Sequence, residues 1–254
     1  MKGGERKIEG IIIDCDGTII GASQEMRPRV REALLKARSR VKISFCTGRP
    51  YKWVVAIAQE FGLDTLHVAE GGARVVSSEG GVKWEKLIPA DAVQIILAMA
   101  QKDDFSVGAQ VSGEDDLEWK SPSRVEPMSH LFLWAYERER VERLIGEMRN
   151  RVPHVHVVLS QFKFKNEPLR WLADITAAGA NKQHALLHLA ELEGLDLKNF
   201  MGIGDGYNDY PFLLACGYKV AMGNAPKELK DIADYVAPSI EEDGVAEAIE
   251  RFIL

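Results

Sequence analysis

The chain has 254 residues, of which 46% are hydrophobic and 28% are charged, an ordinary globular composition that excludes disordered and fibrous classes. Its formal net charge is −6 and it has no long basic run, so we do not expect nucleic acid as a partner. Three scattered cysteines give no disulfide framework, and neither a signal peptide nor an apolar stretch of about 18 residues is evident, so we expect a cytoplasmic protein with no membrane partner.

The first part of the chain alternates predicted strands with predicted helices. Short apolar runs bounded by turn residues indicate buried strands, and longer amphipathic stretches indicate helices. The predicted strands are 7–13, 41–46, 66–69 and 74–77, and the predicted helices are 29–38 and 50–61. Such alternation is typical of βαβ units and a parallel sheet.

The pattern changes between residues 82 and 178, where we predict the order helix, strand, strand, helix, strand, strand. The predicted strands are 105–111, 128–136, 154–159 and 169–175, and the helices are one ending near Lys102 and one around Val141. In the first strand apolar and polar side chains alternate, as in a sheet with one buried face. We therefore predict a second, smaller α+β domain in this segment.

From Gly179 the strand–helix alternation returns. The predicted helices are 181–193, 208–216, a short one from Pro226 and a last one from Gly244, and the predicted strands are 199–203, 218–221 and 234–237. We thus predict an α/β fold: residues 1–81 and 179–254 form a Rossmann-like, doubly wound parallel-sheet core, and residues 82–178 form an inserted α+β domain.

Four short segments place polar groups at predicted strand ends or helix starts. They are Asp14-Cys15-Asp16-Gly17-Thr18, Thr47-Gly48-Arg49, Lys182, and Gly204-Asp205-Gly206-Tyr207-Asn208-Asp209. Taken alone, each would usually be a turn or a surface charge. Because loops at the carboxyl ends of parallel strands gather in one crevice, we expect these four segments to form one site.

The acidic groups predict a metal-assisted phosphoryl transfer. Asp14 and Asp16 stand two residues apart and should direct their carboxylates the same way, and Asp205 should join them from another strand end. Mg²⁺ takes oxygen ligands and typically uses one or two carboxylates plus a substrate phosphate. We expect Asp14 to attack phosphorus, forming an aspartyl-phosphate, and Asp16 to act as general acid and base.

The remaining segments predict a phosphate pocket. Thr47 offers a hydroxyl and Gly48 a backbone amide to the phosphoryl oxygens. Lys182, at a helix start, adds its charge to the helix dipole.

Together these motifs resemble those of haloacid dehalogenase (HAD) superfamily phosphatases of the Cof-like group, which carry a type II (IIB) cap domain between the second and third motifs. The resemblance covers the whole chain. It implies that Asp14, the backbone carbonyl of Asp16 and Asp205 bind Mg²⁺, with Asp209 and Asn208 supporting the site. Relatives often have Asn at the position of Gly71 and Gly at that of Gln183, so this chain departs from them there.

Substrate contacts are predicted from the second motif and from the open face of the cap sheet. Next to the phosphate-binding loop, Arg49 is expected to contact the substrate. On the cap sheet, alternation places several polar residues on the face opposite the helices: Gln110, His154, His156, Arg170 and Asp174. Arg170 is our preferred contact, because a guanidinium suits a second phosphate or a carboxylate. The alternative is that these positions are simply solvated.

We therefore predict a Mg²⁺-dependent phosphatase, a phosphoric monoester hydrolase acting on a small phosphorylated metabolite such as a sugar phosphate or a phosphoglycolate-like compound. A phosphomutase of the same superfamily is a first alternative. A non-enzymatic regulatory domain that stores an aspartyl-phosphate is a second. A monomer and a small homo-oligomer are equally compatible with the sequence.

Overall fold

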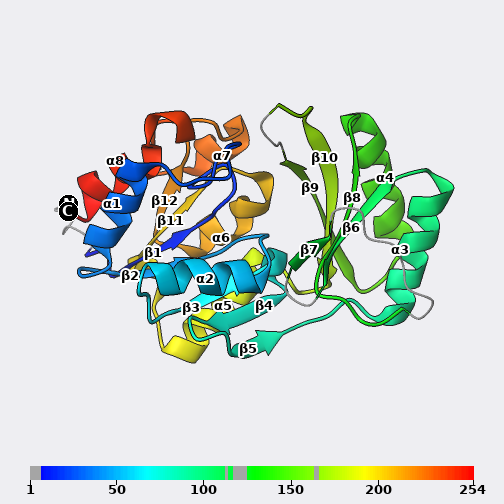
Figure 1. Cartoon of the computed structure of the whole chain (residues 1–254), viewed down its shortest axis with the longest axis horizontal. Helices are drawn as coiled ribbons and strands as arrows, with labels where there is room; N and C mark the ends of the chain where they lie inside the picture. The colour runs from blue at the N-terminus through cyan, green and yellow to red at the C-terminus, as the bar shows by residue number, and fades with distance from the viewer. Residues whose placement is uncertain (1–6, 112–113, 117–124, 163–165) are drawn as a thin grey trace.

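A parallel sheet forms the core of the computed structural model, which describes residues 7–111, 114–116, 125–162 and 166–254 (Figure 1). Its strand order is β13-β12-β11-β1-β2, and all neighbouring strands are parallel. The strands are β1 (Gly10–Ile13), β2 (Lys42–Phe45), β11 (Phe200–Gly204), β12 (Tyr218–Ala221) and β13 (Tyr235–Val236). The predicted parallel core is confirmed.

Helices cover both faces of this sheet, as Figure 1 shows. Ile11 and Ile13 pack on one face, under α1 (Pro28–Ala37), α2 (Tyr51–Glu60) and α8 (Gly244–Phe252). Ile12 packs on the other, under α5 (Lys182–Glu193), α6 (Tyr210–Ala215) and α7 (Lys227–Ile232). Because both faces are buried, β1 needs an uninterrupted apolar run, and each fully buried isoleucine contributes roughly 1.5–3 kcal/mol.

A second, three-stranded antiparallel sheet lies beside the core. It contains β3 (Leu66–Ala69), β4 (Arg74–Ser77) and β5 (Val82–Glu85). The turn residues Gly71-Gly72 predict local pairing of residues 74–77, and β4 does pair with β3, while a single parallel bridge between Cys46 and Val68 joins β3 to the end of β2. The short 3₁₀ turn over Glu70–Gly72 returns the chain at once, which favours an antiparallel neighbour.

The inserted segment forms an antiparallel sheet in the order β7-β6-β8-β10-β9. Its elements are α3 (Ala90–Lys102), β6 (Ser106–Val111), β7 (Glu114–Asp116), β8 (Leu131–Ala135), α4 (Arg138–Arg151), β9 (Val155–Phe162) and β10 (Arg170–Ala177). The predicted α+β insertion is confirmed. Strands β5 and β7 are not predicted from the sequence, and the boundaries 1–81, 82–178 and 179–254 stay a prediction.

Helices α3 and α4 cover the face of the cap sheet that is turned away from the parallel sheet (Figure 1). Apolar residues of β8 and β10 alternate into that helix-covered core, among them Leu131, Leu133, Ala173 and Ile175. The opposite face therefore looks toward the carboxyl ends of the parallel strands. Within the described ranges, no helix combines the length and apolarity needed to cross a bilayer.

Candidate active site

A buried lysine bridges two buried carboxylates behind the carboxyl end of β1. Asp14 directly follows β1, and the Nζ of Lys182 lies 2.5 Å from Asp14 Oδ1 and 2.6 Å from Asp209 Oδ1. These three residues are 4%, 2% and 0% exposed respectively. Lys182 is the first residue of α5, which begins where predicted because the Asn181 side chain accepts a hydrogen bond from the His184 amide. Burying these charges is tolerable because each has an opposite charge in contact.

Asp209 also stabilises, through hydrogen bonds, the turn that contains Asp205. Its second oxygen, Oδ2, accepts hydrogen bonds from the amides of Asp205 (2.9 Å) and Gly206 (2.8 Å). Both carboxylate oxygens of Asp209 thus have donors already. Its geometry fits the supporting role that the family resemblance implies better than that of a principal metal ligand.

Asp205 is held from two sides. Thr18 Oγ1 donates to its Oδ1 at 2.9 Å, and Asn224 Nδ2 donates to its Oδ2 at 3.0 Å. Gly17, with φ of +83°, passes so close that a Cβ there would lie 2.2 Å from Asp205 Oδ2. Only glycine can take this backbone conformation and this approach without strain.

Three carboxylates converge here: Asp14, Asp205 and Asp209 each place an oxygen within 4.8 Å of the others. Burial, the charge of Asp209 and, less strongly, that of Asp16 raise the pKa of Asp14 to about 7 against the lowering effect of Lys182. Burial and the charges of Asp14 and Asp209 also raise the pKa of Asp205 well above its usual value. For Lys182, the two carboxylates outweigh burial and hold its pKa well above normal. This oxygen-only donor set suits a hard divalent cation such as Mg²⁺.

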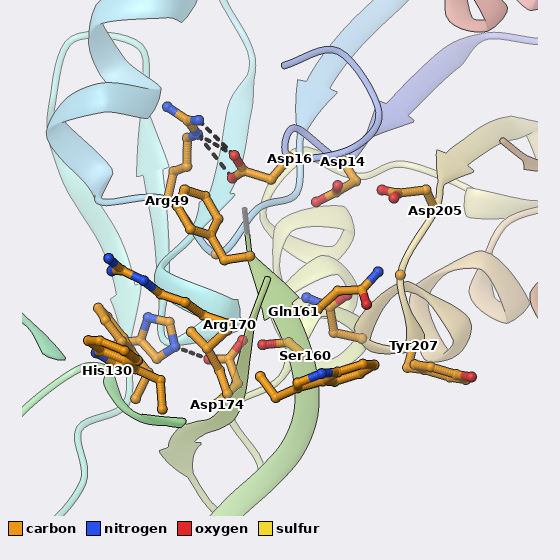
Figure 2. Close-up of a pocket in the computed structure, with 18 of the residues that line it drawn as sticks. Asp14, Asp16, Arg49, His130, Ser160, Gln161, Arg170, Asp174, Asp205 and Tyr207 are labelled. Atoms are coloured by element: carbon orange, nitrogen blue, oxygen red, sulfur yellow. Dashed lines mark hydrogen bonds and ion pairs between the residues drawn. The ribbon is translucent and has the colours of Figure 1, made fainter. Parts of the chain in front are cut away.

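The carboxylate of Asp16 is not part of this cluster. Arg49 donates to it through Nε, at 3.1 and 3.0 Å from its two oxygens, and through Nη2 at 2.6 Å (Figure 2). We expect its carboxylate beside those of Asp14 and Asp205, and the structure corrects this, because the forked guanidinium matches a carboxylate with two hydrogen bonds. Arg49 is itself held by Gln24 Oε1 at 2.7 Å and lies 4.3 Å from the ring centre of Trp53.

The second motif follows β2. Thr47 is fully buried, and its Oγ1 accepts a hydrogen bond from the Arg49 amide at 3.1 Å. Gly48 faces open space, since a Cβ there would meet no atom within 4 Å. Its carbonyl accepts a hydrogen bond at 2.6 Å from Gln110 of the cap sheet, so this loop also joins the two sheets.

A cavity of about 470 Å³ lies between these loops and the open face of the cap sheet (Figure 2). Several predicted site residues line it: Asp14, Asp16, Gly48, Arg49, Arg170, Asp205 and Asn208. In the described part of the chain, Thr47, Lys182 and Asp209 lie behind this lining. Arg170 faces the cavity as predicted, but its Nη2 already donates to Glu167 at 2.7 Å.

Two further features of the site are absent from the sequence prediction. Asn224 binds the Gly17 carbonyl at 2.9 Å as well as Asp205, and accepts from the Ile240 amide at 3.0 Å, so it ties three loops together. The sequence does carry a signal for Asn224, because the Gly223-Asn224 turn follows the predicted strand β12 and places a polar residue at the carboxyl end of the sheet. The second feature is His130, a buried residue just before β8, which pairs with Asp174, a residue that the sequence predicts on the open face of the cap sheet. Burial raises the pKa of Asp174, but His130, together with Lys182 and Ser160, outweighs burial and holds the pKa below its usual value.

Residues 11–166 and 127–249 match the family model described as haloacid dehalogenase-like hydrolase. The chain is 26% identical over 249 residues to the 5-amino-6-(5-phospho-D-ribitylamino)uracil phosphatase of Bacillus subtilis, covering 97% of this chain and 96% of that protein. It is 28% identical over 247 residues to the phosphoglycolate phosphatase of Methanothermobacter thermautotrophicus, covering 97% and 99%.

Solved structures show the same fold. A haloacid dehalogenase-like hydrolase from Bacteroides thetaiotaomicron superposes with a TM-score of 0.78 at 25% identity, covering 96% of this chain and 99% of that one. A HAD subclass IIB sugar phosphatase superposes with a TM-score of 0.79 at 23% identity, covering 96% and 98%. The predicted enzyme class, a phosphoric monoester hydrolase, agrees with the names of these relatives. The family predicted from the four motifs is confirmed, and the chain belongs to the haloacid dehalogenase-like hydrolases.

Proposed function

We propose that this protein is a Mg²⁺-dependent phosphatase that hydrolyses a small phosphorylated metabolite through an aspartyl-phosphate on Asp14. The observation that carries the proposal is the placement of Asp14 between Lys182 and Asp205 at the edge of the 470 Å³ cavity. The relatives are named as phosphatases of small phosphorylated compounds, which supports the same substrate class.

In the first step, a carboxylate oxygen of Asp14 forms a bond to phosphorus, and the bond from phosphorus to the leaving oxygen breaks. Asp16 takes a proton from solvent once it has left Arg49 and gives that proton to the leaving oxygen, so the alcohol departs. To do so its carboxylate turns from Arg49 toward the cavity, which both residues line. In the second step Asp16 takes a proton from water, whose oxygen attacks phosphorus and releases Asp14 and inorganic phosphate.

Neighbouring groups of this chain would stabilise the negative charge on the phosphoryl oxygens. The Gly48 amide and the Thr47 hydroxyl would donate to these oxygens, and Lys182 supplies a fixed positive charge behind Asp14. Asp14, the Asp16 carbonyl and Asp205 would hold Mg²⁺, with Asp209 behind them. When bound, the ion neutralises charge on the transferring phosphoryl group.

Phosphate release tests the proposal. With Mg²⁺ the protein should hydrolyse 4-nitrophenyl phosphate and some members of a panel of small phosphomonoesters, and EDTA should stop the reaction. Asp14→Asn should abolish turnover without changing the circular dichroism spectrum, because the amide is nearly isosteric but a poor nucleophile. Asp231→Asn is the matched control, since Asp231 is exposed and pairs with Lys227 on α7.

The alternatives give different results in the same assay. A phosphomutase would move phosphate within its substrate and require a bisphosphate activator, whereas a phosphatase releases phosphate from a monophosphate alone. A phospho-accepting regulatory domain would turn over no ester in the panel, and that result would refute the proposal.

The buried free thiols of Cys15, Cys46 and Cys216 fit the predicted cytoplasmic location. A monomer or small homo-oligomer stays a prediction.

A further inference from the structure

Aromatic side chains form much of the cavity wall opposite Asp14 and Asp205. The aromatic residues that line the cavity are Phe132, Trp134, Phe162, Trp171 and Tyr207. The Phe132 ring covers Gly108 of the neighbouring strand, where a Cβ would lie 1.9 Å from the ring. The Arg170 guanidinium lies 4.3 Å from the centre of the Trp134 ring. Planar surfaces of this kind favour a planar ligand group, because offset stacking adds to the gain from burial alone.

The charges on the same wall disfavour a second anionic group on the substrate. On the cap side of the cavity, the two lining arginines of the described residues already have carboxylate partners. The pairs are Arg138 with Glu142 at 2.8 Å and Arg170 with Glu167 at 2.7 Å. A substrate carboxylate or second phosphate would have to compete with one of these partners.

Asp174 adds a carboxylate to this wall, and His130 offsets part of its charge. Its side chain is 15% exposed, is bonded to His130, and lies across the cavity from Asp14 and Asp205 (Figure 2). Figure 2 shows Ser160 and Gln161 between Asp174 and the catalytic carboxylates. A carboxylate in this position can accept N–H or O–H groups of a ligand and repels an anion.

We propose that the leaving group of the substrate is an uncharged alcohol that carries a planar ring with hydrogen-bond donors at its edge. The inference rests on the proposed phosphatase function and narrows its substrate class. The cavity volume of about 470 Å³ falls within the range of roughly 300–1,000 Å³ that is usual for ligands of this size. An acidic leaving group such as glycolate fits the wall poorly, since it offers no ring to the aromatic residues and places a carboxylate near Asp174.

Two matched substrate pairs test the two parts of the proposal. 2-Phenylethyl and 2-cyclohexylethyl phosphate are similar in size and differ in whether the ring is flat, and kcat/KM should be about three- to tenfold higher for the phenyl ester. Phosphoglycolate and its carboxamide differ in charge at similar size, and kcat/KM should be about tenfold or more higher for the amide.

Variants locate the origin of each preference. Trp134→Leu should bring the phenyl-to-cyclohexyl ratio close to one, whereas Trp84→Leu should keep it, because Trp84 stacks on His188 rather than lining the cavity. Asp174→Asn should reduce the preference for the amide. The wild-type ratios test the proposal even if a variant does not fold.

The outcomes separate this inference from the proposed function. If all four esters are hydrolysed and both ratios are near one, or if phosphoglycolate is preferred to its amide, the inference is wrong and the phosphatase function stands. If no ester, including 4-nitrophenyl phosphate, releases phosphate with Mg²⁺, the proposed function is wrong and the inference falls with it.

Discussion

Replacing Lys182 with methionine should strongly destabilise the folded protein. Its ammonium group is 2.5 Å from Asp14 and 2.6 Å from Asp209, and the side chain is 2% exposed. Methionine of similar length would leave both buried carboxylates without their cation. Removing one partner of a buried ion pair typically costs about 3–5 kcal/mol, because the remaining charge stays desolvated. We expect a loss of that size in the free energy of unfolding, measured by urea denaturation at pH 7.5 with EDTA.

Lys42→Met is the matched control for this experiment. The Lys42 Nζ lies 3.0 Å from Glu193 Oε2, but the lysine side chain is 48% exposed. Exposed pairs contribute at most about 1 kcal/mol, so this variant should unfold nearly like the wild type. Adding Asp209→Asn to Lys182→Met should recover part of the loss, because it removes one uncompensated charge. If Lys182→Met alone stays within about 1 kcal/mol of the wild type, the buried pairs are not what holds this part of the core together.

Three further predictions concern the proposed metal site and the turn between β3 and β4. Asn224→Leu removes two hydrogen bonds at Gly17 and Asp205, so the Mg²⁺ concentration for half-maximal activity should rise about 10–100-fold; an unchanged value would contradict the role of Asn224. The pKa of Asp14, raised from 3.8 to about 7, means that the Mg²⁺-free folded state binds more protons than the unfolded chain across that window, so its stability falls as pH rises through it. Mg²⁺ should therefore raise Tm more at pH 8 than at pH 5.5, and calorimetric scans showing equal rises would refute this assignment. Gly71→Asn restores the residue usual in relatives, but a Cβ there lies 3.1 Å from Thr176 and 3.5 Å from His130, so we expect a lower Tm; a higher one would show that the cap accommodates the side chain.

The sequence predicts the elements whose burial is complete, and it fails where burial is partial. Strands β1 and β11 are continuous apolar runs because helices cover both of their faces, and that pattern has few other interpretations. Strand β5 escapes prediction because Val82, Lys83 and Glu85 are exposed, so its pairing with β4 leaves no apolar alternation in the sequence.

The two ends of the cavity differ in how far residue type alone determines chemistry. At the phosphate end, the fold delivers each polar group to the carboxyl edge of one sheet, so Asp14, Lys182 and Asp205 could be predicted to meet from their positions at strand ends and a helix start. At the other end, the function of a side chain depends on its partner. Arg170 alone would suit an anion, as we expect from the sequence, but Glu167 occupies its Nη2 and Trp134 lies against its face.

Asp16 shows the same dependence on a partner within the first motif. Its spacing from Asp14 predicts that the two carboxylates point together, yet Arg49, 33 residues away in the chain, turns the Asp16 side chain aside. The spacing of two residues predicts how the backbone presents them. The orientation of a side chain also depends on the partner that the tertiary fold brings to it. The two carboxylates of the first motif therefore pair with different cations, Asp14 with Lys182 and Asp16 with Arg49.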